Sequence, residues 1–397
     1  MNESAVLETV HDLPLLDRTL DWASVNSGTT NLAGLQTVAD RLANAFAVLP
    51  GDVALIEPAP VETVRADGKI DKIARGRHLH VTVRPDAPVQ LLLTGHMDTV
   101  FPADHMFQTV SEIEPGILNG PGLADMKGGI SVMLGALQMI EKSDAAARIG
   151  YEVMINSDEE AGSASSAALI RRCAMGKTAA LTYEPALADG TLAGARGGSG
   201  NFSIIFTGKS AHAGRNPDEG RNALVAAADM ALRLKALHRT GLFVNPAKID
   251  GGGPNNAVPE HAVLRVNFRP ATLEDQGEAQ AALDTLVSQI AHEHGVSIHA
   301  HGGFGRPPKP IDPQAQKLFD LVKACGAELG LDIAWRSTGG VCDGNNIAAC
   351  GIPVVDTMGA RGGAIHSSDE FLIVESLAER ARLSALTLLR LAEKGAL

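Results

Sequence analysis

Hydrophobic positions in the first half of the chain follow two different periods. Short apolar runs at residues 89–94, 151–156 and 179–183 have the length and composition of buried strands. Residues 128–142, between the first two runs, carry apolar side chains at helical spacings of three and four. This helical face consists of Ile130, Met133, Leu134, Leu137 and Ile140. The alternation of strands with helices predicts an α/β sheet that is covered by helices on both faces.

The pattern changes near residue 197. From there to about residue 301 it predicts strand, helix, strand, strand, helix and strand, which is the order of a ferredoxin-like unit. The six elements are expected at residues 201–207, 222–237, 243–250, 262–269, 274–294 and 296–300. In the fourth element Leu264, Val266 and Phe268 alternate with polar residues, as in a strand with one buried face.

The α/β pattern resumes after Pro310, with a strand expected at 352–356 and a long amphipathic helix at 373–393. Glycine-rich segments at 194–200 and 302–309 bracket the middle unit. A chain of 397 residues is also long for a single hydrophobic core. We therefore predict an α/β catalytic domain, residues 1–197 and 308–397, into which an α+β lid, residues 198–307, is inserted.

Composition and charge argue against several classes of protein. The formal net charge is −12 and no basic cluster stands out, so a nucleic-acid partner is not expected. No apolar stretch reaches the roughly 18 residues of a membrane helix, so no membrane contact is expected. The first residues lack the apolar core of a signal peptide, and the four cysteines are scattered. These features predict a cytoplasmic protein with free thiols.

Acidic and histidine residues follow the predicted strands directly. His96 follows the first strand, Glu159 and Glu160 follow the second, and Glu184 follows the third. The carboxyl ends of the strands in such a sheet meet at one edge, where these folds place their sites. Three separate segments therefore bring polar side chains to one rim.

These residues, with Asp125 and His366, suffice to bind two divalent metal ions. Zinc takes histidine nitrogen and carboxylate oxygen, and cobalt or manganese is an alternative. Asp125 lies in a glycine-flanked turn and could bridge the two ions. Asp98, two residues after His96, could orient its imidazole. Of the neighbouring Glu159 and Glu160, one can be a ligand while the other serves as general base.

The motifs around these residues resemble those of the dinuclear zinc aminoacylase and carboxypeptidase family. That family includes bacterial glutamate carboxypeptidase, acetylornithine deacetylase and succinyl-diaminopimelate desuccinylase. The shared motifs are TGHMDT at 94–99, NGPGLADMKGG at 119–129, NSDEEAGS at 156–163, YEP at 183–185, SAHAG at 210–214, NNAVP at 255–259 and HS at 366–367. Their order and spacing span nearly the whole chain, and as a set they are highly specific.

The resemblance implies a role for each candidate residue. The implied metal ligands are His96 and Glu184 on one ion, Glu160 and His366 on the other, and Asp125 between them. Glu159 then matches the general base. The resemblance also implies a homodimer formed through the inserted domain, 198–307, which is then both lid and dimerisation domain. In it, His212 matches a histidine that stabilises the oxyanion in the partner subunit's site. Asn256 and Arg269 match residues that hold polar groups of the substrate, with Arg269 on a carboxylate.

We accordingly expect a carboxypeptidase of the glutamate type, acting on a peptide or N-acyl amino acid with a free α-carboxylate. An N-acyl-amino-acid deacylase, such as a deacetylase or desuccinylase, is the alternative that shares this site. A non-catalytic binding protein would have lost a ligand or Glu159, and a dinucleotide-dependent oxidoreductase lacks its glycine motif here. One departure is Cys342, which stands where relatives carry serine or threonine and leaves fine details of substrate contact open.

Overall fold

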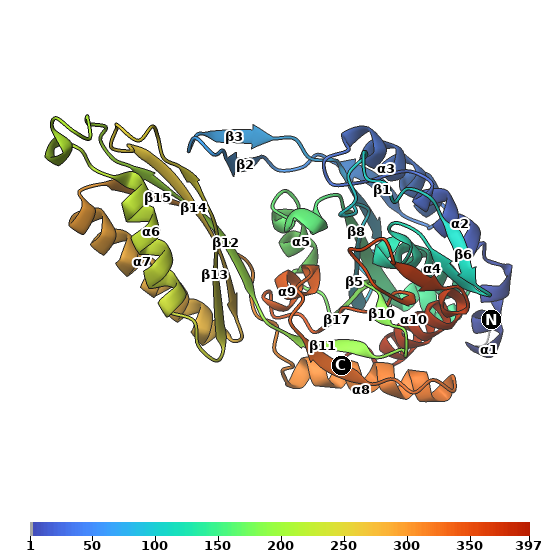
Figure 1. Ribbon diagram of the computed structural model, residues 1–397. Helices are drawn as coiled ribbons and strands as arrows, with labels where there is room; N and C mark the ends of the chain where they lie inside the picture. Colours follow the sequence, from blue (N-terminus) through green and yellow to red (C-terminus); the bar gives the residue numbers. More distant parts are fainter. Residues whose placement is uncertain (1–2) are drawn as a thin grey trace.

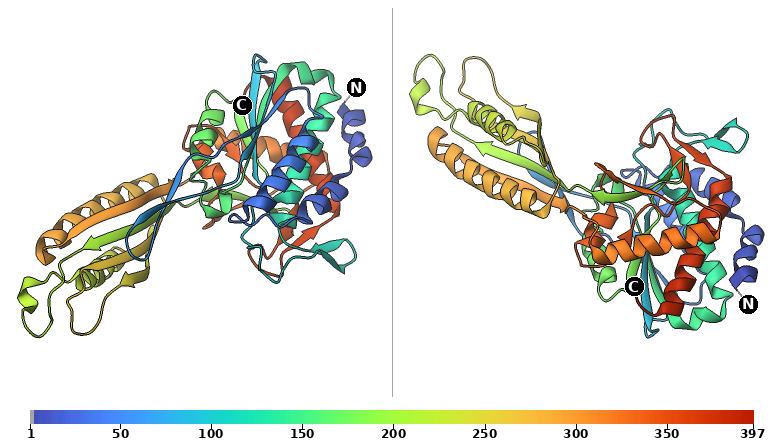
Figure 2. Two further views of the ribbon diagram at one scale, coloured as in Figure 1. Left: turned by 90° about the horizontal axis from the view of Figure 1, so that it is seen from above. Right: turned by 90° about the horizontal axis from the view of Figure 1, so that it is seen from below.

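The computed structural model describes residues 3–397 and has a larger and a smaller part (Figure 1). The smaller part, Ser199–Arg306, is called the lid below, and it projects from one side of the larger part in all views (Figure 2). The first and last described residues, Glu3 and Leu397, belong to the larger part. None of the helices in residues 3–397 has the length and apolar character needed to cross a membrane.

A six-stranded sheet forms the centre of the larger part, in the order β1-β4-β8-β5-β9-β17. Its strands are β1 (Asp52–Ile56), β4 (His78–Val83), β8 (Ile149–Asn156), β5 (Val89–His96), β9 (Ala179–Thr182) and β17 (Val354–Val355). The last four run parallel to one another, β4 pairs with β8 in the antiparallel direction, and β1 at the edge is antiparallel to β4. The three strands predicted from apolar runs, β5, β8 and β9, are therefore confirmed, and their carboxyl ends lie at one edge of the sheet.

Helices cover both faces of this sheet, as predicted. One face packs against α2 (Leu15–Ala23), α3 (Leu32–Phe46), α4 (Gly128–Glu141), α8 (Pro313–Glu328) and α10 (Glu375–Lys394), with α1 (Glu3–Glu8) beside α10. The other face packs against the short helices α5 (Ala167–Ala174) and α9 (Asp343–Ala348). Because side chains alternate along a strand, Leu91 and Leu93 of β5 enter the first core and Leu92 enters the second.

The lid contains the six predicted elements in the predicted order. They are β12 (Ser199–Thr207), α6 (Ala223–Ala236), β13 (Leu242–Gly251), β14 (His261–Pro270), α7 (Leu273–His294) and β15 (Ser297–Arg306). The sheet order β13-β14-β12-β15 is ferredoxin-like. Leu264, Val266 and Phe268 are buried in a core that the sheet forms with α6 and α7. The exact limits of an inserted domain at residues 198 and 307 remain a prediction.

One expectation for the lid is wrong. The last strand of the lid was expected to end at residue 300, but β15 continues through the glycine-rich segment to Arg306 and pairs with the start of β12. Glycine is needed at residue 302, where φ is +114° and a Cβ atom would lie 2.2 Å from the Asn201 carbonyl oxygen. The strand thus carries Arg306 out of the lid and toward the larger part.

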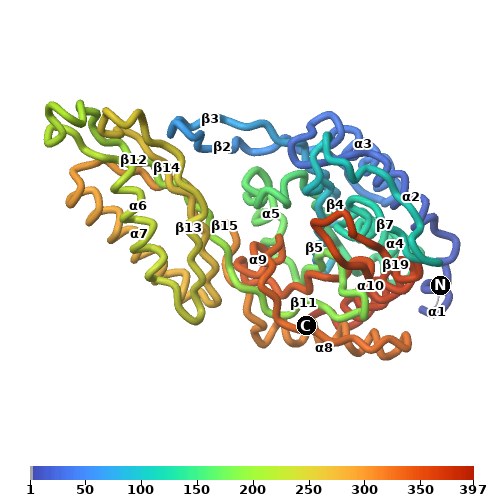
Figure 3. The backbone as a smooth tube through the Cα atoms, in the orientation of Figure 1, coloured from blue at the N-terminus to red at the C-terminus, as the bar shows by residue number. Residues whose placement is uncertain are grey.

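Some smaller pieces of sheet have no counterpart in the sequence pattern. A hairpin of β2 (Val61–Val64) and β3 (Ile70–Ile73) reaches from the larger part toward the lid (Figure 3). Arg265 of the lid donates a 2.8 Å hydrogen bond to the Val64 carbonyl of this hairpin. Two further sheets frame the site: β11 (Leu192–Arg196) with β16 (Trp335–Thr338), and the sheet β10-β18-β19-β7-β6. The strands of the latter are β10 (Ala186–Leu187), β18 (Arg361–Gly363), β19 (Phe371–Ile373), β7 (Ile117–Asn119) and β6 (Ser111–Glu114).

Candidate metal centre and active site

The five predicted metal ligands lie together at the carboxyl edge of the central sheet. His96, Asp125 and Glu184 form one group, and Asp125, Glu160 and His366 form a second. Within each group the potential ligand atoms all lie within 4.8 Å of one another. Asp125 belongs to both groups, which is the position a bridging carboxylate requires.

His96 is held so that one ring nitrogen faces the carboxylates. Its Nε2 atom lies 3.0 Å from Asp125 Oδ1 and 3.7 Å from Glu184 Oε2. Its Nδ1 atom lies 3.0 Å from the carbonyl oxygen of Asp98 and 3.4 Å from the Oδ1 atom of that residue. The sequence spacing had suggested that Asp98 orients this imidazole, and the geometry suits that role.

The buried Asp98 carboxylate also holds the turn after β8. It accepts hydrogen bonds from the backbone N–H of Glu159 at 3.1 Å and of Glu160 at 3.2 Å, and from the Thr29 hydroxyl at 2.7 Å. Asp98 thereby ties the backbone that carries Glu159 and Glu160 to the segment of His96, 61 residues earlier in the chain.

The second group completes the cluster from a loop near the C-terminus. The Nε2 atom of His366 lies 3.3 Å from Asp125 Oδ2 and 3.2 Å from Glu160 Oε2. His366 has φ of +64°, a left-handed conformation that is uncommon for a residue other than glycine. Its side chain is 52% exposed, whereas those of Asp125 and Glu160 are 6% exposed. His366 therefore closes the cluster on its solvent side.

Glu370 fixes the loop that carries Asp125, and the sequence analysis had not singled it out. Its buried carboxylate accepts backbone N–H groups from Gly122 at 3.1 Å, Ala124 at 3.0 Å and Asp125 at 3.1 Å. In the sequence, only its position four residues after the predicted ligand His366 could have pointed to Glu370. Because Glu370 lies in the same loop region as His366, it links the shared carboxylate to the second histidine.

Several buried carboxylates are concentrated in this cluster. Burial raises the pKa of Glu160 to about 7 and also raises the pKa of Glu184; the neighbouring histidines oppose this rise and the charge of Asp125 adds to it. Burial opposes protonation of His96, but the charges of Glu184, Asp125 and Asp98 outweigh it and hold the pKa of His96 well above its usual value. Nitrogen and carboxylate donors that gather around an excess of negative charge fit two divalent ions, which would replace the protons.

Glu159 belongs to neither ligand group, and its carboxylate is bonded to a guanidinium that the sequence analysis missed. Arg306 Nη2 donates to Glu159 Oε1 at 2.7 Å and to the Ser163 hydroxyl at 2.8 Å. Arg306 Nη1 is bonded to Asp343 and, at 2.9 Å, to Asn346 Oδ1. Arg306 is the last residue of β15, so the lid connection contacts the proposed general base directly.

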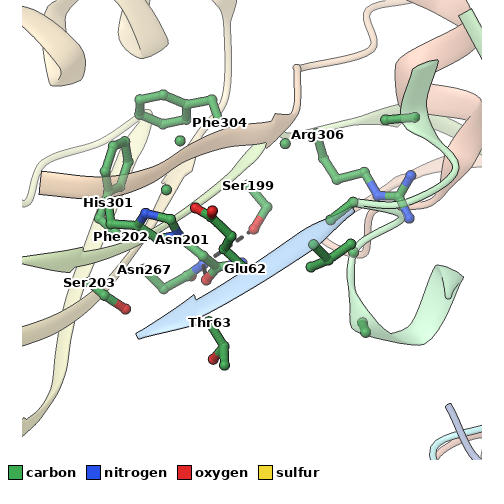
Figure 4. Close-up of a pocket in the computed structure, with 18 of the residues that line it drawn as sticks. Glu62, Thr63, Ser199, Asn201, Phe202, Ser203, Asn267, His301, Phe304 and Arg306 are labelled. Carbon is green, nitrogen blue, oxygen red and sulfur yellow. Dashed lines mark hydrogen bonds between the residues drawn. The ribbon is translucent and has the colours of Figure 1, made fainter. Parts of the chain in front are cut away.

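Arg306 also borders a cavity of about 970 Å³ that lies away from the metal ligands (Figure 4). The β2–β3 hairpin contributes Glu62 and Thr63 to this cavity, and the exposed face of the lid sheet contributes Asn267 and His301. None of the predicted metal ligands lines it. The cluster geometry, and not cavity size, therefore locates the candidate active site.

A smaller cavity of about 270 Å³ adjoins the cluster. Its lining includes the five predicted ligands except His96, together with Glu159. The remaining wall comes mainly from β11, β16 and the loops that follow them. It includes Thr191, Arg196, Arg336, Thr338 and Cys342.

Cys342 in this wall is buried and its Sγ atom lies 3.5 Å from Asp356 Oδ2. Burial raises the pKa of this thiol well above its usual value, so the neutral thiol is the stable form. All four cysteines have free thiols, as predicted.

The three predicted lid residues do not reach the cluster within one chain. His212 and Asn256 lie side by side, because Ala213 N–H donates to the Asn256 carbonyl at 2.9 Å and His212 bridges to Ala257. The loop that carries His212, between β12 and α6, lies at the end of the lid farthest from the larger part (Figure 1). Arg269 is exposed near the other end, where its Nε atom donates to Asn267 Oδ1 at 2.9 Å. None of the three lines the 270 Å³ cavity, so their roles remain predictions.

Known proteins resemble this chain over most of its length. The model of peptidase family M20/M25/M40 matches residues 92–390. Carboxypeptidase G2 of Pseudomonas sp. (strain RS-16) is 31% identical over 303 residues, which are 74% of this chain and 72% of that protein. Succinyl-diaminopimelate desuccinylase of Psychrobacter arcticus is 26% identical over 336 residues, 79% of this chain and 82% of that protein. Aminopeptidase PepT of Bacillus cereus has a similar structure, with a TM-score of 0.71, 23% identity and coverage of 95% of this chain and 98% of that one.

Fold and cluster together define a class: metal-dependent amide hydrolases with an α/β catalytic domain and an inserted α+β lid. The chain belongs to peptidase family M20/M25/M40. The family resemblance and the fold class predicted from the sequence are thereby confirmed. The relatives differ in the amide bond that their names specify, so the particular substrate is a separate question.

Proposed function

We propose that the protein is a dinuclear zinc carboxypeptidase of the glutamate carboxypeptidase type. The observation that carries this proposal is the pair of ligand groups that share Asp125 beside the cavity containing Glu159. His96 and Glu184 would hold one ion, and Glu160 and His366 the other. Carboxypeptidase G2, at 31% identity, supports this type of reaction.

When bound, the two ions would supply Lewis acidity, which polarises a carbonyl and acidifies water. Glu159 is proposed to take the proton from the attacking water and to give it to the leaving amine. Arg306 holds the carboxylate of Glu159 through the 2.7 Å hydrogen bond and keeps it on the cavity side of the turn. Asp98 fixes the ring of His96 and the backbone of both glutamates, so the groups are ordered before substrate binds.

The lid is proposed to contribute the remaining contacts. His212 would stabilise the oxyanion in the site of the partner subunit, since its loop is at the far end of its own lid. Arg269 and Asn256 would hold substrate, with Arg269 on the α-carboxylate. Arg265 shares the face of Arg269 but is already bonded to Ser203 at 3.0 Å and to the Val64 carbonyl at 2.8 Å. Arg269 is therefore the more available of the two arginines.

An N-acyl-amino-acid deacylase remains the second candidate, because the desuccinylases match the chain over a comparable length. Both reactions use the same metal cluster and differ in which side of the amide is recognised. In either case we propose a cytoplasmic homodimer that acts on a small peptide or N-acyl amino acid.

A substrate panel tests the proposed type of reaction. The metal-loaded protein should hydrolyse dipeptides and aroyl amino acids with C-terminal glutamate at a higher kcat/KM than N-acetyl-ornithine or N-succinyl-diaminopimelate. Each substrate is also tested with its α-carboxylate amidated, which should abolish most of the activity. A preference for the two N-acyl diamino acids would favour the deacylase, and turnover that ignores amidation would contradict both candidates.

A further inference from the structure

Arg336 stands out among the charged groups that line the 270 Å³ cavity. It lies on β16 and is exposed to the cavity. Within the described residues 3–397, its guanidinium makes no hydrogen bond or ion pair with another side chain. An opposite charge that affects it is that of Asp189, which is exposed to solvent. A solvent-screened charge of that kind provides little compensation. Arg336 is thus a cation that the protein itself leaves available.

The other arginine in this wall, Arg196, is not available in the same way. Its Nε atom donates to Asp356 Oδ2 at 2.7 Å, and its Nη1 atom donates to the Gly340 carbonyl at 3.0 Å. Asp356 is fully buried and also accepts Lys309 Nζ at 2.9 Å. Arg196 is therefore part of a buried ion network that supports the wall, whereas Arg336 faces the space that substrate would occupy.

The strand holds Arg336 in this position. Its neighbour Trp335 packs on the ring of Phe319 with centroids 5.1 Å apart, and alternation along β16 places Arg336 on the opposite side. The backbone pairing of Ala193 with Arg336 joins β16 to β11, which lines the same cavity. The guanidinium therefore extends from an ordered strand.

We infer that Arg336 is a specificity-determining residue that binds a second carboxylate of the substrate, beyond the α-carboxylate assigned to Arg269. This inference rests on the proposed function and names the class of substrate, a dicarboxylic one. A planar guanidinium matches a carboxylate with two parallel hydrogen bonds, and the hydroxyls of Thr191 and Thr338 line the same wall. The cavity is small, so a single amino acid with a short acyl group fits its scale.

The second carboxylate can lie on either side of the scissile amide. A carboxypeptidase would present the side chain of glutamate, and a desuccinylase would present the free end of a succinyl group. Two substrate pairs separate these sources. They are N-acetyl-L-glutamate against N-acetyl-L-glutamine, and N-succinyl-L-alanine against N-succinamoyl-L-alanine.

The test measures kcat/KM for both pairs with the metal-loaded protein. The wild type should favour the acid over the amide about 10- to 100-fold in one pair, the scale of a charged hydrogen bond. Arg336→Ala and Arg336→Gln should bring that ratio close to one while the amide substrates change by less than about threefold, and Arg336→Lys should retain part of the preference. Titration calorimetry should show the same effect in binding. The wild type should bind L-glutamate more tightly than L-glutamine, or succinate more tightly than succinamate, and Arg336→Ala should lose this difference. Arg172→Ala, at an exposed arginine that lines neither cavity, is the matched control.

Equal losses on acid and amide, or an acid preference that survives Arg336→Ala, would overturn the inference. The inference would also be overturned if the wild type hydrolysed these substrates but preferred the acid in neither pair. In that case the proposed hydrolase function would still stand. If the metal-loaded wild type hydrolysed no substrate in these two pairs or in the substrate panel described above, the proposed function itself would be overturned.

Discussion

Replacement of Glu159 by glutamine is expected to lower kcat by at least about 10²-fold, the scale of a lost general base. Glutamine keeps the shape of the side chain, and its amide oxygen can still accept the hydrogen bond that Arg306 now donates at 2.7 Å. The metal content and the fold should therefore stay close to those of the wild type. Rapid kinetics and metal analysis on the same preparation check both parts of this prediction.

Glu160→Gln provides the contrast to Glu159→Gln, because Glu160 is a proposed metal ligand. The Oε2 atom of Glu160 lies 3.2 Å from His366 Nε2 in the second ligand group. That variant should lower metal occupancy, with activity falling along with it. Glu114→Gln changes an exposed glutamate on β6 and should leave both quantities unchanged. If Glu159→Gln lost metal while Glu160→Gln kept it, the roles of these neighbouring residues would be reversed.

His212→Ala is expected to lower kcat by about 10²- to 10³-fold, the scale of a lost oxyanion donor. The His212 loop lies at the far end of its own lid, so the effect should act across the two-fold axis of a dimer. Mixing His212→Ala with Glu159→Gln subunits should then restore one complete site in every mixed dimer. With random exchange, about one quarter of wild-type activity is expected.

Exchange is followed with differently tagged subunits, and each inactive homodimer serves as a control. Sedimentation should show a dimer for both variants. Mixed dimers that form but stay inactive would mean that His212 acts within its own chain or has no part in the reaction.

The sequence predicted the parts of the site that follow from local patterns. His96 ends β5, and Glu159 and Glu184 follow shortly after β8 and β9, whose apolar runs are easily recognised; parallel pairing brings the ends of these strands together. Asp98 lies two residues from His96, so its proximity to the ring also follows from strand geometry. The motifs then assigned His366, which no periodic pattern could have located.

The residues that the sequence analysis missed depend on contacts between distant segments. Arg306 reaches Glu159 across 147 positions of the chain, and the strand that carries it, β15, had been expected to end at residue 300. Arg336 lies on a short strand without a clear hydrophobic period, and only the folded structure shows that it lines the cavity beside the cluster. A single sequence does not encode such pairings as a local signal.

Metal titration is the most direct measurement of a dinuclear site. Chelation should abolish activity, and zinc or cobalt added back to the chelated protein should restore it until two ions are bound per chain, because the two ligand groups share only Asp125. Calorimetry and elemental analysis give the number of bound ions, and the turnover of a C-terminal glutamate substrate gives the activity. Recovery that is complete at one ion per chain, or undiminished turnover by the fully chelated protein, would contradict the proposed dinuclear hydrolase.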